Sequence, residues 1–420
     1  MSLFIPLKHR SFRLVFSGQV LSDFGNWVYF IALTVLISYS WHLGAAALSA
    51  LTIVFGIPWV VIGPLCSVWV DRLPKKAVMI SCDLLRAAAT IGLVFAPNLY
   101  VLLFFVFIIE SLGSLFDPAR QAVIRMTVPE AALAEASSLS QLSINATKII
   151  APAVGGALLI VMKAQGVFII ETVIFLLSAF ILSWLKVHSP EEDSQNETGK
   201  KKYWVEWSEG FKYIFSKKML AYGILMTAIG MFFVFLYDGF FVLWARKIGF
   251  GKESFGLVLS MIGFGSISGA ALVGQWAIWK SNPLRFMCLS GMLSGFLIVC
   301  FGLGGLSLIH MNLTVWMAIV FLLGVTGMGT TVPFGYILQT QTSAKLMGRV
   351  SSSSNALINF SMLLAPALGA VFVSWLGIGA VFLISGIAFV LLGFFFGLMI
   401  TFQAHLNEKK RPKKQARFYF

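Results

Sequence analysis

Charged side chains occur deep inside several long apolar stretches of this 420-residue chain. Asp23, Glu110 and Lys148 each lie about eleven residues from an end of their stretch, so a helix places them ~16 Å deep, near the middle of a bilayer. Asp238 lies less deep. Such charges are costly unless they face a water-filled cavity or a partner. Burial disfavours a carboxylate relative to its protonated acid, so Asp23, Glu110 and Asp238 are candidates for binding and releasing protons.

Lys148 needs a partner at its depth, because an isolated ammonium group inside a bilayer is strongly disfavoured. Glu110 lies on the preceding apolar stretch, which crosses in the opposite direction and brings the two residues to a similar depth. Asp23 is the competing partner. One interpretation is a static pair that joins two helices. The other is a switch, in which protonation of Glu110 frees Lys148 for Asp23 or for an anionic substrate group.

The elements that carry these residues are membrane-spanning helices. Apolar residues make up 58% of the chain and charged residues 11%, against about a quarter in soluble domains. The sequence predicts an all-α polytopic membrane protein with twelve transmembrane helices. The expected spans are residues 12–38, 45–70, 77–96, 99–118, 137–162, 166–185, 219–245, 253–279, 284–305, 312–340, 348–375 and 378–402.

One pattern of residues occurs twice, in the same order and with nearly the same spacing. The first copy contains Pro118, Ser137-Ser138, Asn145 and Ala151-Pro152-Ala153, and the second contains Pro333, Ser351-Ser352, Asn359 and Ala365-Pro366-Ala367. Parallel repeats of this kind occur in membrane proteins built from two equivalent halves. We expect a six-helix half in residues 1–185, a cytoplasmic linker in 186–218, a second six-helix half in 219–402 and a basic tail in 403–420.

The basic residues indicate the orientation. Most of the 31 lysines and arginines fall in tails and loops that share one side of the membrane, among them Lys8, Arg72, Lys200 and Arg349. Since basic loops stay in the cytoplasm, both termini are expected inside a multi-pass protein of the plasma or inner membrane. The net charge of +14 is thus explained by topology and contact with anionic lipid, and we expect no nucleic acid as a partner.

Cysteine and histidine usage favours neither a metal site nor a disulfide. Cys66, Cys82, Cys288 and Cys300 lie in or beside apolar runs without paired spacing, and the five histidines are not clustered. We expect reduced packing cysteines, no cofactor and no metal. The short basic N-terminus runs into an apolar segment without a small-residue cleavage site, which predicts an uncleaved first span.

A charged turn after the second span carries the clearest resemblance to a known family. Asp71-Arg72-Leu73-Pro74-Lys75-Lys76 resembles the loop signature of the major facilitator superfamily, although Ser67 and Pro74 stand where that family has glycine. In the family, the acid and base bind across the cytoplasmic ends of the two halves. The resemblance implies a cytoplasmic gate of Asp71, Arg72, Lys75, Lys76 and Arg86. The alternative is a turn that only sets topology.

Further motifs resemble one branch of that superfamily. Asp83-Leu84-Leu85-Arg86 and Phe116-Asp117-Pro118-Ala119 resemble the drug/proton antiporters that include macrolide and enterobactin exporters. The resemblance implies proton-coupled export of amphipathic small molecules by alternating access. In the family fold, helices 1, 4, 7 and 10 line the cavity, which favours Asp23, Glu110 and Asp238 as functional acids. Asp83, Arg86 and Glu171 lie on helices that pack further out, which favours structural roles.

The fifth span carries Ala151-Pro152-Ala153-Val154-Gly155-Gly156, which is similar to an element of the family's exporters. Proline there frees a backbone carbonyl, and small residues allow helices to approach. Pro152, Gly155, Gly156 and Pro366 are therefore candidate helix bends. The element either sets the direction of transport or serves only packing, and its second occurrence at Ala365-Pro366 favours packing.

Two other functions remain open. A lipid or lysophospholipid flippase of the same fold would share nearly all these features. A polytopic membrane enzyme would carry clusters of His, Asp or Glu in long loops, whereas the outer loops here are very short, so we expect no enzymatic activity. The expected partners are a small-molecule substrate, protons and the lipid bilayer, and the expected state is a monomer.

Overall fold

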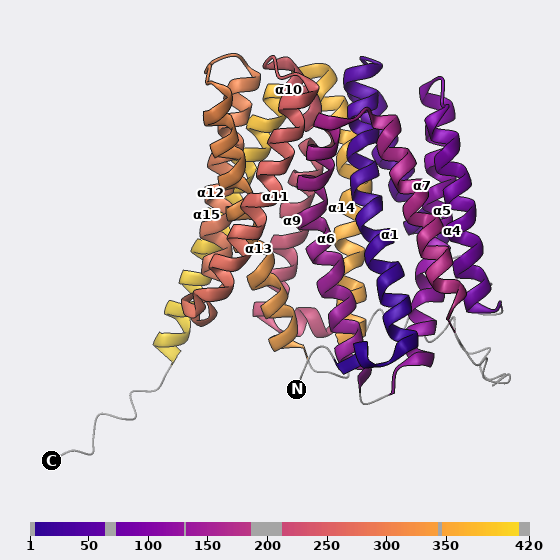
Figure 1. The fold of residues 1–420 in the computed structure, drawn as a ribbon. Coiled ribbons are helices and arrows are strands. Elements are labelled where there is room, and N and C mark those ends of the chain that lie inside the picture. The colour runs from indigo at the N-terminus through magenta and orange to yellow at the C-terminus, as the bar shows by residue number, and fades with distance from the viewer. Residues whose placement is uncertain (1–4, 64–72, 130–131, 186–211, 343–346, 411–420) are drawn as a thin grey trace.

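The structure is a computed structural model that describes residues 5–63, 73–129, 132–185, 212–342 and 347–410, which are helical and contain no strand (Figure 1). The first group of helical segments is η1 (Ile5–Lys8), α1 (Arg10–Val35), η2 (Leu36–Ser40), α2 (Ala45–Ile57), η3 (Pro58–Ile62), α4 (Lys75–Val94), α5 (Leu99–Thr127), α6 (Leu133–Val161) and α7 (Ala164–Ser183). The second is α9 (Lys218–Tyr237), η5 (Asp238–Phe240), α10 (Phe241–Lys247), α11 (Lys252–Gln275), η6 (Ala277–Ser281), α12 (Pro283–Gly305), α13 (Leu313–Gln341), α14 (Met347–Leu376) and α15 (Ile378–Lys410).

The helices agree with the predicted membrane-spanning fold. Ten segments of the described chain are long and apolar enough to cross a bilayer. Two further long helices, α6 and α14, cover the remaining predicted spans, and each begins with a serine-rich, polar stretch. The two largest differences from the predicted boundaries are at the ends of α5 and α15. Helix α5 continues through Pro118 to Thr127, because an internal proline removes one hydrogen bond without preventing the next turns. Helix α15 continues past residue 402 to Lys410.

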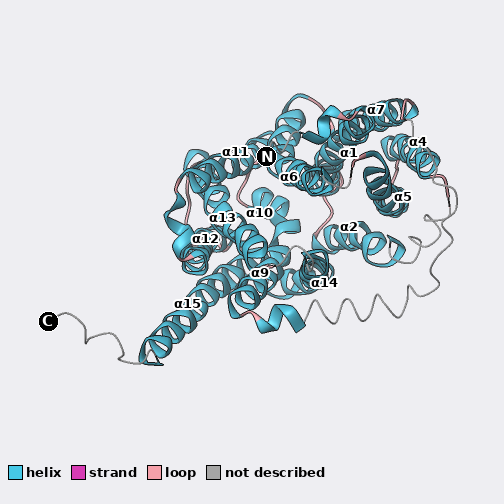
Figure 2. Cartoon of the chain, turned by 90° about the horizontal axis from the view of Figure 1, so that it is seen from below, coloured by secondary structure: helices cyan, strands magenta, loops and turns pink. Residues whose placement is uncertain are grey.

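The helices form two groups that lie side by side (Figure 2). One contains α1, α2 and α4 to α7, and the other contains α9 to α15. Two pairs of helices join the groups, since α6 packs against α11 and α14 packs against α2. The repeated polar pattern begins α6 and α14, so each copy of the repeat supplies one helix of the junction. The predicted linker falls largely outside the described residues.

The described ends of the chain, η1 and the last turns of α15, lie at the same end of the bundle (Figure 1). At the opposite end, which we call the distal end, hydrogen bonds join the two groups of helices among the described residues. They run from Tyr39 Oη to the Phe250 carbonyl (2.9 Å), from Ser49 Oγ to the Pro366 carbonyl (3.0 Å) and from Arg246 Nη1 to the Ser38 carbonyl (2.6 Å). We call these six residues the distal seal.

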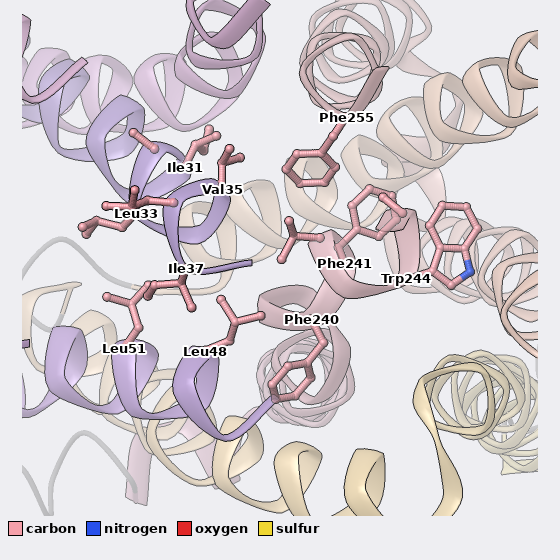
Figure 3. Close-up of a cluster of buried hydrophobic side chains, with 14 of the residues drawn as sticks. Ile31, Leu33, Val35, Ile37, Leu48, Leu51, Phe240, Phe241, Trp244 and Phe255 are labelled. Carbon is pink, nitrogen blue, oxygen red and sulfur yellow. The ribbon is translucent and has the colours of Figure 1, made fainter. Parts of the chain in front are cut away.

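Apolar side chains fill the space beside the distal seal. Ile31 and Val35 of α1 and Leu48 of α2 lie opposite Phe241 and Phe255 of the other group, within one buried cluster (Figure 3). The Phe241 and Phe255 rings are 6.2 Å apart, and Phe255 also meets Tyr39 at 5.9 Å. Dispersion and aromatic contacts thus continue across the junction instead of stopping at each group.

Helices α6 and α11 touch through glycine. A Cβ atom placed on Gly156 would overlap the main-chain carbonyl of Gly256, and a Cβ on Gly256 would overlap that of Gly156. Backbone approach this close requires residues without side chains. Gly156 therefore fixes the spacing of the two groups at the distal end.

We expect Gly156→Ala to lower the melting temperature of the detergent-solubilised protein, because α6 and α11 must separate to admit the methyl group. Overpacking of this kind costs roughly 1–3 kcal/mol. The matched control is Gly274→Ala on α11, since a Cβ there meets nothing within 4 Å. Equal melting temperatures for the two variants would show that the helices do not touch at Gly156.

Candidate functional site

A buried arginine lies at the centre of a polar cluster in the first group of helices. Arg86 of α4 is 1% exposed. Its Nη1 donates to Ser22 Oγ (3.0 Å) and its Nη2 donates to Asn26 Oδ1 (2.7 Å), both on α1. The guanidinium lies 4.0 Å above the ring of Phe175 on α7, which is a cation–π contact. Asp83, one turn earlier on α4, is 3.8 Å from Nη1, within ion-pair range and beyond hydrogen-bond range.

Glu110 of α5 is buried on the same side of the bundle, with 1% of its surface exposed. Its Oε1 accepts from the Tyr29 hydroxyl at 3.0 Å, and its Oε2 accepts from Trp59 Nε1 at 2.9 Å. Trp59 lies in the π-helical segment η3, so the carboxyl group joins three helical segments. A Cβ on Gly113, one turn further along α5, would lie 3.5 Å from the Trp59 ring and 3.7 Å from Arg86 Nη2.

Glu171 of α7 is the third buried acid, with 2% exposure. Its carboxyl group lies directly against the main chain of α1 at Gly25, where a Cβ atom would overlap both oxygens. Its Oε1 has no hydrogen-bond partner among the described residues. We call Asp83, Arg86, Glu110 and Glu171, with their neighbours Ser22, Asn26, Tyr29 and Trp59, the arginine cluster.

One face of α1 makes this cluster possible. Gly18, Ser22, Gly25 and Tyr29 recur every three or four residues and therefore share a face. A Cβ on Gly18 would lie 3.1 Å from Ser178 Oγ, one end of the antiparallel contact with α7 whose other end is Gly25. This small and polar face is not among the features predicted from the sequence. Its spacing is the signal that would have placed α1 against α4 and α7.

Asp23 lies beside the cluster, on the α6 side of α1. It is half-buried, and Gln19 Nε2 donates to its Oδ2 at 3.2 Å. Gln19 Nε2 also lies 3.3 Å from the Ser140 carbonyl of α6. This contact sets the register of α1 and α6. Lys148 lies about two turns beyond Ser140 and two turns before Gly155 on α6, so its backbone lies between the levels of Gln19 and Val28 of α1. The Lys148 side chain, and so its predicted pairing, lies outside the described residues.

Asp238 lies apart from the cluster. It begins the short 3₁₀ segment η5, which interrupts the helical path between α9 and α10 at an Asp-Gly pair. Asp238 is exposed although Leu236, Tyr237 and Phe240 are buried. A Cβ on Gly239 would lie 3.3 Å from Thr52 Oγ1 of α2, so this acid is positioned at the junction of the two groups.

The predicted cytoplasmic gate is only partly described. Asp71 and Arg72 lie outside the described residues. Lys75 Nζ donates to the Leu73 carbonyl (3.1 Å), and Lys76 Nζ donates to the Ser183 carbonyl (2.7 Å) at the C-terminal end of α7, where a cation is stabilising. Arg86 lies ~16 Å further along α4 than these lysines. The structure therefore separates Arg86 from the charged turn with which the family resemblance groups it, because its partners are on α1, on α7 and on α4 itself.

The candidate bends lie inside uninterrupted helices. Pro152 and Pro366 are internal residues of α6 and α14. A Cβ on Gly155 would lie 3.2 Å from Ile31 Cδ1 and 3.5 Å from Val28 Cα, so this glycine admits α1, as Gly156 admits α11. Cys82, Cys288 and Cys300 are free. Within the described residues, no group of three His, Cys, Asp or Glu is arranged to hold a metal ion.

Comparisons with known proteins match this chain to one family. A model of the Major Facilitator Superfamily matches residues 15–357. The chain is 30% identical to the putative bacilysin exporter BacE of Bacillus amyloliquefaciens, over 69% of this chain and 72% of the relative. It is 24% identical to macrolide efflux protein A of Streptococcus pyogenes, over 89% and 92%. A crystal structure of a bacterial homologue of the human lysosomal transporter Spinster, inward-facing and unoccupied, superposes with a TM-score of 0.65 at 15% identity over 93% of this chain and 96% of that chain.

We expect Trp59→Phe to destabilise the protein, because it leaves the buried Glu110 Oε2 without its donor. An unsatisfied buried acceptor costs roughly 1–3 kcal/mol, which thermal unfolding in detergent would detect. Trp375→Phe is the control, since it makes the same chemical change at a side chain that is 79% exposed. A Trp59→Phe protein as stable as this control would mean that the indole contributes no net hydrogen bond.

Proposed function

Because the chain belongs to the major facilitator superfamily, we propose that it is a secondary transporter that exports amphipathic small molecules in exchange for protons. The observation that carries this proposal is Glu110, a fully buried carboxyl group held by one phenol and one indole inside a membrane-spanning helix. Such a group can exist as a neutral acid or as a hydrogen-bonded anion. Asp23 and Asp238 offer further carboxyl groups near the junction. Two relatives named as exporters support the direction of transport.

Half-buried aromatic residues on α1 and α9 support a proposal for the substrate class. Trp27 and Phe30 of α1 and Phe232 and Phe233 of α9 are half-buried aromatic residues, suited to apolar and ring-bearing molecules. The exposed Asp238, at the end of α9, suits a polar or cationic end. We propose a substrate with both features.

We propose that the distal seal faces the outside of the cell. If both termini are cytoplasmic, as the basic loops predict, the seal closes the path to the outside in this conformation. Export then requires the seal to open. The gate at Asp71, Arg72, Lys75 and Lys76 would close the cytoplasmic side in that second state and remains a prediction. We propose that the protein acts as a monomer in the cell membrane.

Transport into inside-out vesicles tests the function. A macrolide and a set of dipeptides would be offered under an imposed pH gradient, with and without a protonophore. We expect accumulation that the protonophore abolishes. Accumulation that persists without a gradient would overturn proton coupling. Movement of a fluorescent lipid in proteoliposomes, with no uptake of the soluble compounds, would instead identify a flippase.

We expect Asp23→Asn to remain in the membrane and to lose gradient-driven accumulation, because the amide cannot exchange a proton while still accepting from Gln19. Downhill movement of substrate should persist. The control is Asp117→Asn, since Asp117 is a carboxylate in the C-terminal half of α5 that accepts hydrogen bonds from Arg120 and Gln121. Normal accumulation against a gradient by Asp23→Asn would assign Asp23 a structural role.

A further inference from the structure

The arginine cluster contains three buried carboxyl groups around one guanidinium. We propose that Glu171 holds a proton in this conformation, and that Arg86 is the counter-ion of its carboxylate after that proton passes to water. This inference deepens the proposed function and rests on it, since a bound proton matters for transport only if transport is coupled to protons. It assigns the second coupling site to an acid that the sequence analysis treated as structural.

Charge balance is the first argument. Asp83, Glu110 and Glu171 are 0%, 1% and 2% exposed, and Arg86 is the cation among them. Three carboxylates and one guanidinium would leave two uncompensated negative charges in a region of low dielectric. Each buried ion carries a desolvation penalty of several kcal/mol, and one partner cannot offset three. The cluster therefore reaches a tolerable charge only by binding protons.

Among the side chains that the structure describes on the surrounding helices, no other charged group removes this excess. On α1 the nearest is Asp23, a further acid. On α5, Arg120 is paired with Asp117 one turn before it. The segment η3 contributes the neutral Trp59. Helix α7 contributes Glu171, while the side chain of Lys148 on α6 lies outside the described residues.

The hydrogen bonds indicate which carboxyl group is protonated. Glu110 accepts two hydrogen bonds, which favours its anion. Neither oxygen of Asp83 has a hydrogen-bond partner among the described residues, but Asp83 lies 3.8 Å from Arg86, a cation that stabilises its charged form, whereas the described residues place no cation within ion-pair distance of Glu171. Glu171 has an oxygen with no partner and lies against the main chain of Gly25. These surroundings therefore favour the neutral, protonated form of Glu171 over its carboxylate.

Arg86 can serve as a counter-ion to Glu171 as well as to Asp83, which it meets only at 3.8 Å. Its two terminal nitrogens donate to the neutral oxygens of Ser22 and Asn26, and its Nε has no partner among the described residues. The guanidinium stacks on Phe175, which lies one turn from Glu171 on α7. It is thus positioned near Glu171 without being neutralised by it.

The hydrogen bonds from Arg86 to α1 link the proton on Glu171 to the movement of α1. If Arg86 turns toward an ionised Glu171, it gives up Ser22 and Asn26, the polar bonds that hold α1 to α4. Helix α1 continues through η2 into Ser38 and Tyr39 of the distal seal. Release of the proton therefore loosens the helix that carries one side of the seal.

Infrared difference spectroscopy of the purified protein in liposomes tests the proton directly. Protonated carboxyl groups give a carbonyl band that is absent for carboxylates. At neutral pH we expect such a band in the wild type and its loss in Glu171→Gln, a variant that mimics the neutral acid. Asp117→Asn should leave the band unchanged. Arg86→Gln should move the pH at which the band disappears upward by about one unit or more, because it removes the counter-ion.

Retention of the wild-type band by Glu171→Gln would overturn the inference, as would an unshifted titration in Arg86→Gln. If Glu171→Gln cannot be purified, ¹³C-glutamate labelling of Glu110→Gln decides the matter, since a labelled protonated band should persist there and its loss would assign the proton to Glu110. Failure of the proposed function is separable, because it appears in vesicles as transport that ignores the pH gradient whatever the spectrum shows.

Discussion

A cation inside the thickness of a bilayer must be surrounded by partners, and the packing of the first helical group follows from how Arg86 meets that constraint. Its guanidinium bonds α1, stacks on α7 and lies against α5 while remaining on α4. The small residues nearby serve the same need. Gly113 leaves room for the guanidinium, and Gly25 leaves room for the carboxyl group of Glu171. A side chain at Gly25 would force that carboxyl group away from α1, whereas a Cβ on Gly113 would only touch the guanidinium.

The second helical group achieves its packing differently. Its centre at the distal end is aromatic, with Trp244 meeting Phe301 at 4.8 Å and Trp316 at 4.9 Å, both edge to face. The Trp244 indole donates to the Phe301 carbonyl, so the polar atom is satisfied by the main chain. The repeated pattern places equivalent helices at the junction, whereas the buried ionisable chemistry of the described residues lies mostly in one group.

The fold follows from apolar length, and for that reason the sequence predicts it well. The depth of a residue along its membrane span can also be predicted from the sequence, because each residue adds about 1.5 Å along a helix. Glu110 is as buried as its position in the span suggests. The choice of partners was not readable. It depends on the rotation of each helix about its own axis, because the side chains of consecutive residues point in directions that differ by about 100°. The family resemblance groups Arg86 with the charged turn, and it gives Glu171 a structural role because the helix of Glu171 is expected to pack outside the cavity.

The donors and acceptors of the distal seal differ in how they respond to genetic change. The donors are the side chains of Tyr39, Ser49 and Arg246, and the acceptors are the main-chain carbonyls of residues 38, 250 and 366. Any amino acid supplies a carbonyl, so the acceptor positions can drift during evolution without loss of the bond. Each donor is a specific side chain, and its substitution would remove the hydrogen bond. Lineages descended from this chain should therefore vary freely at one half of the seal while remaining restricted at the other.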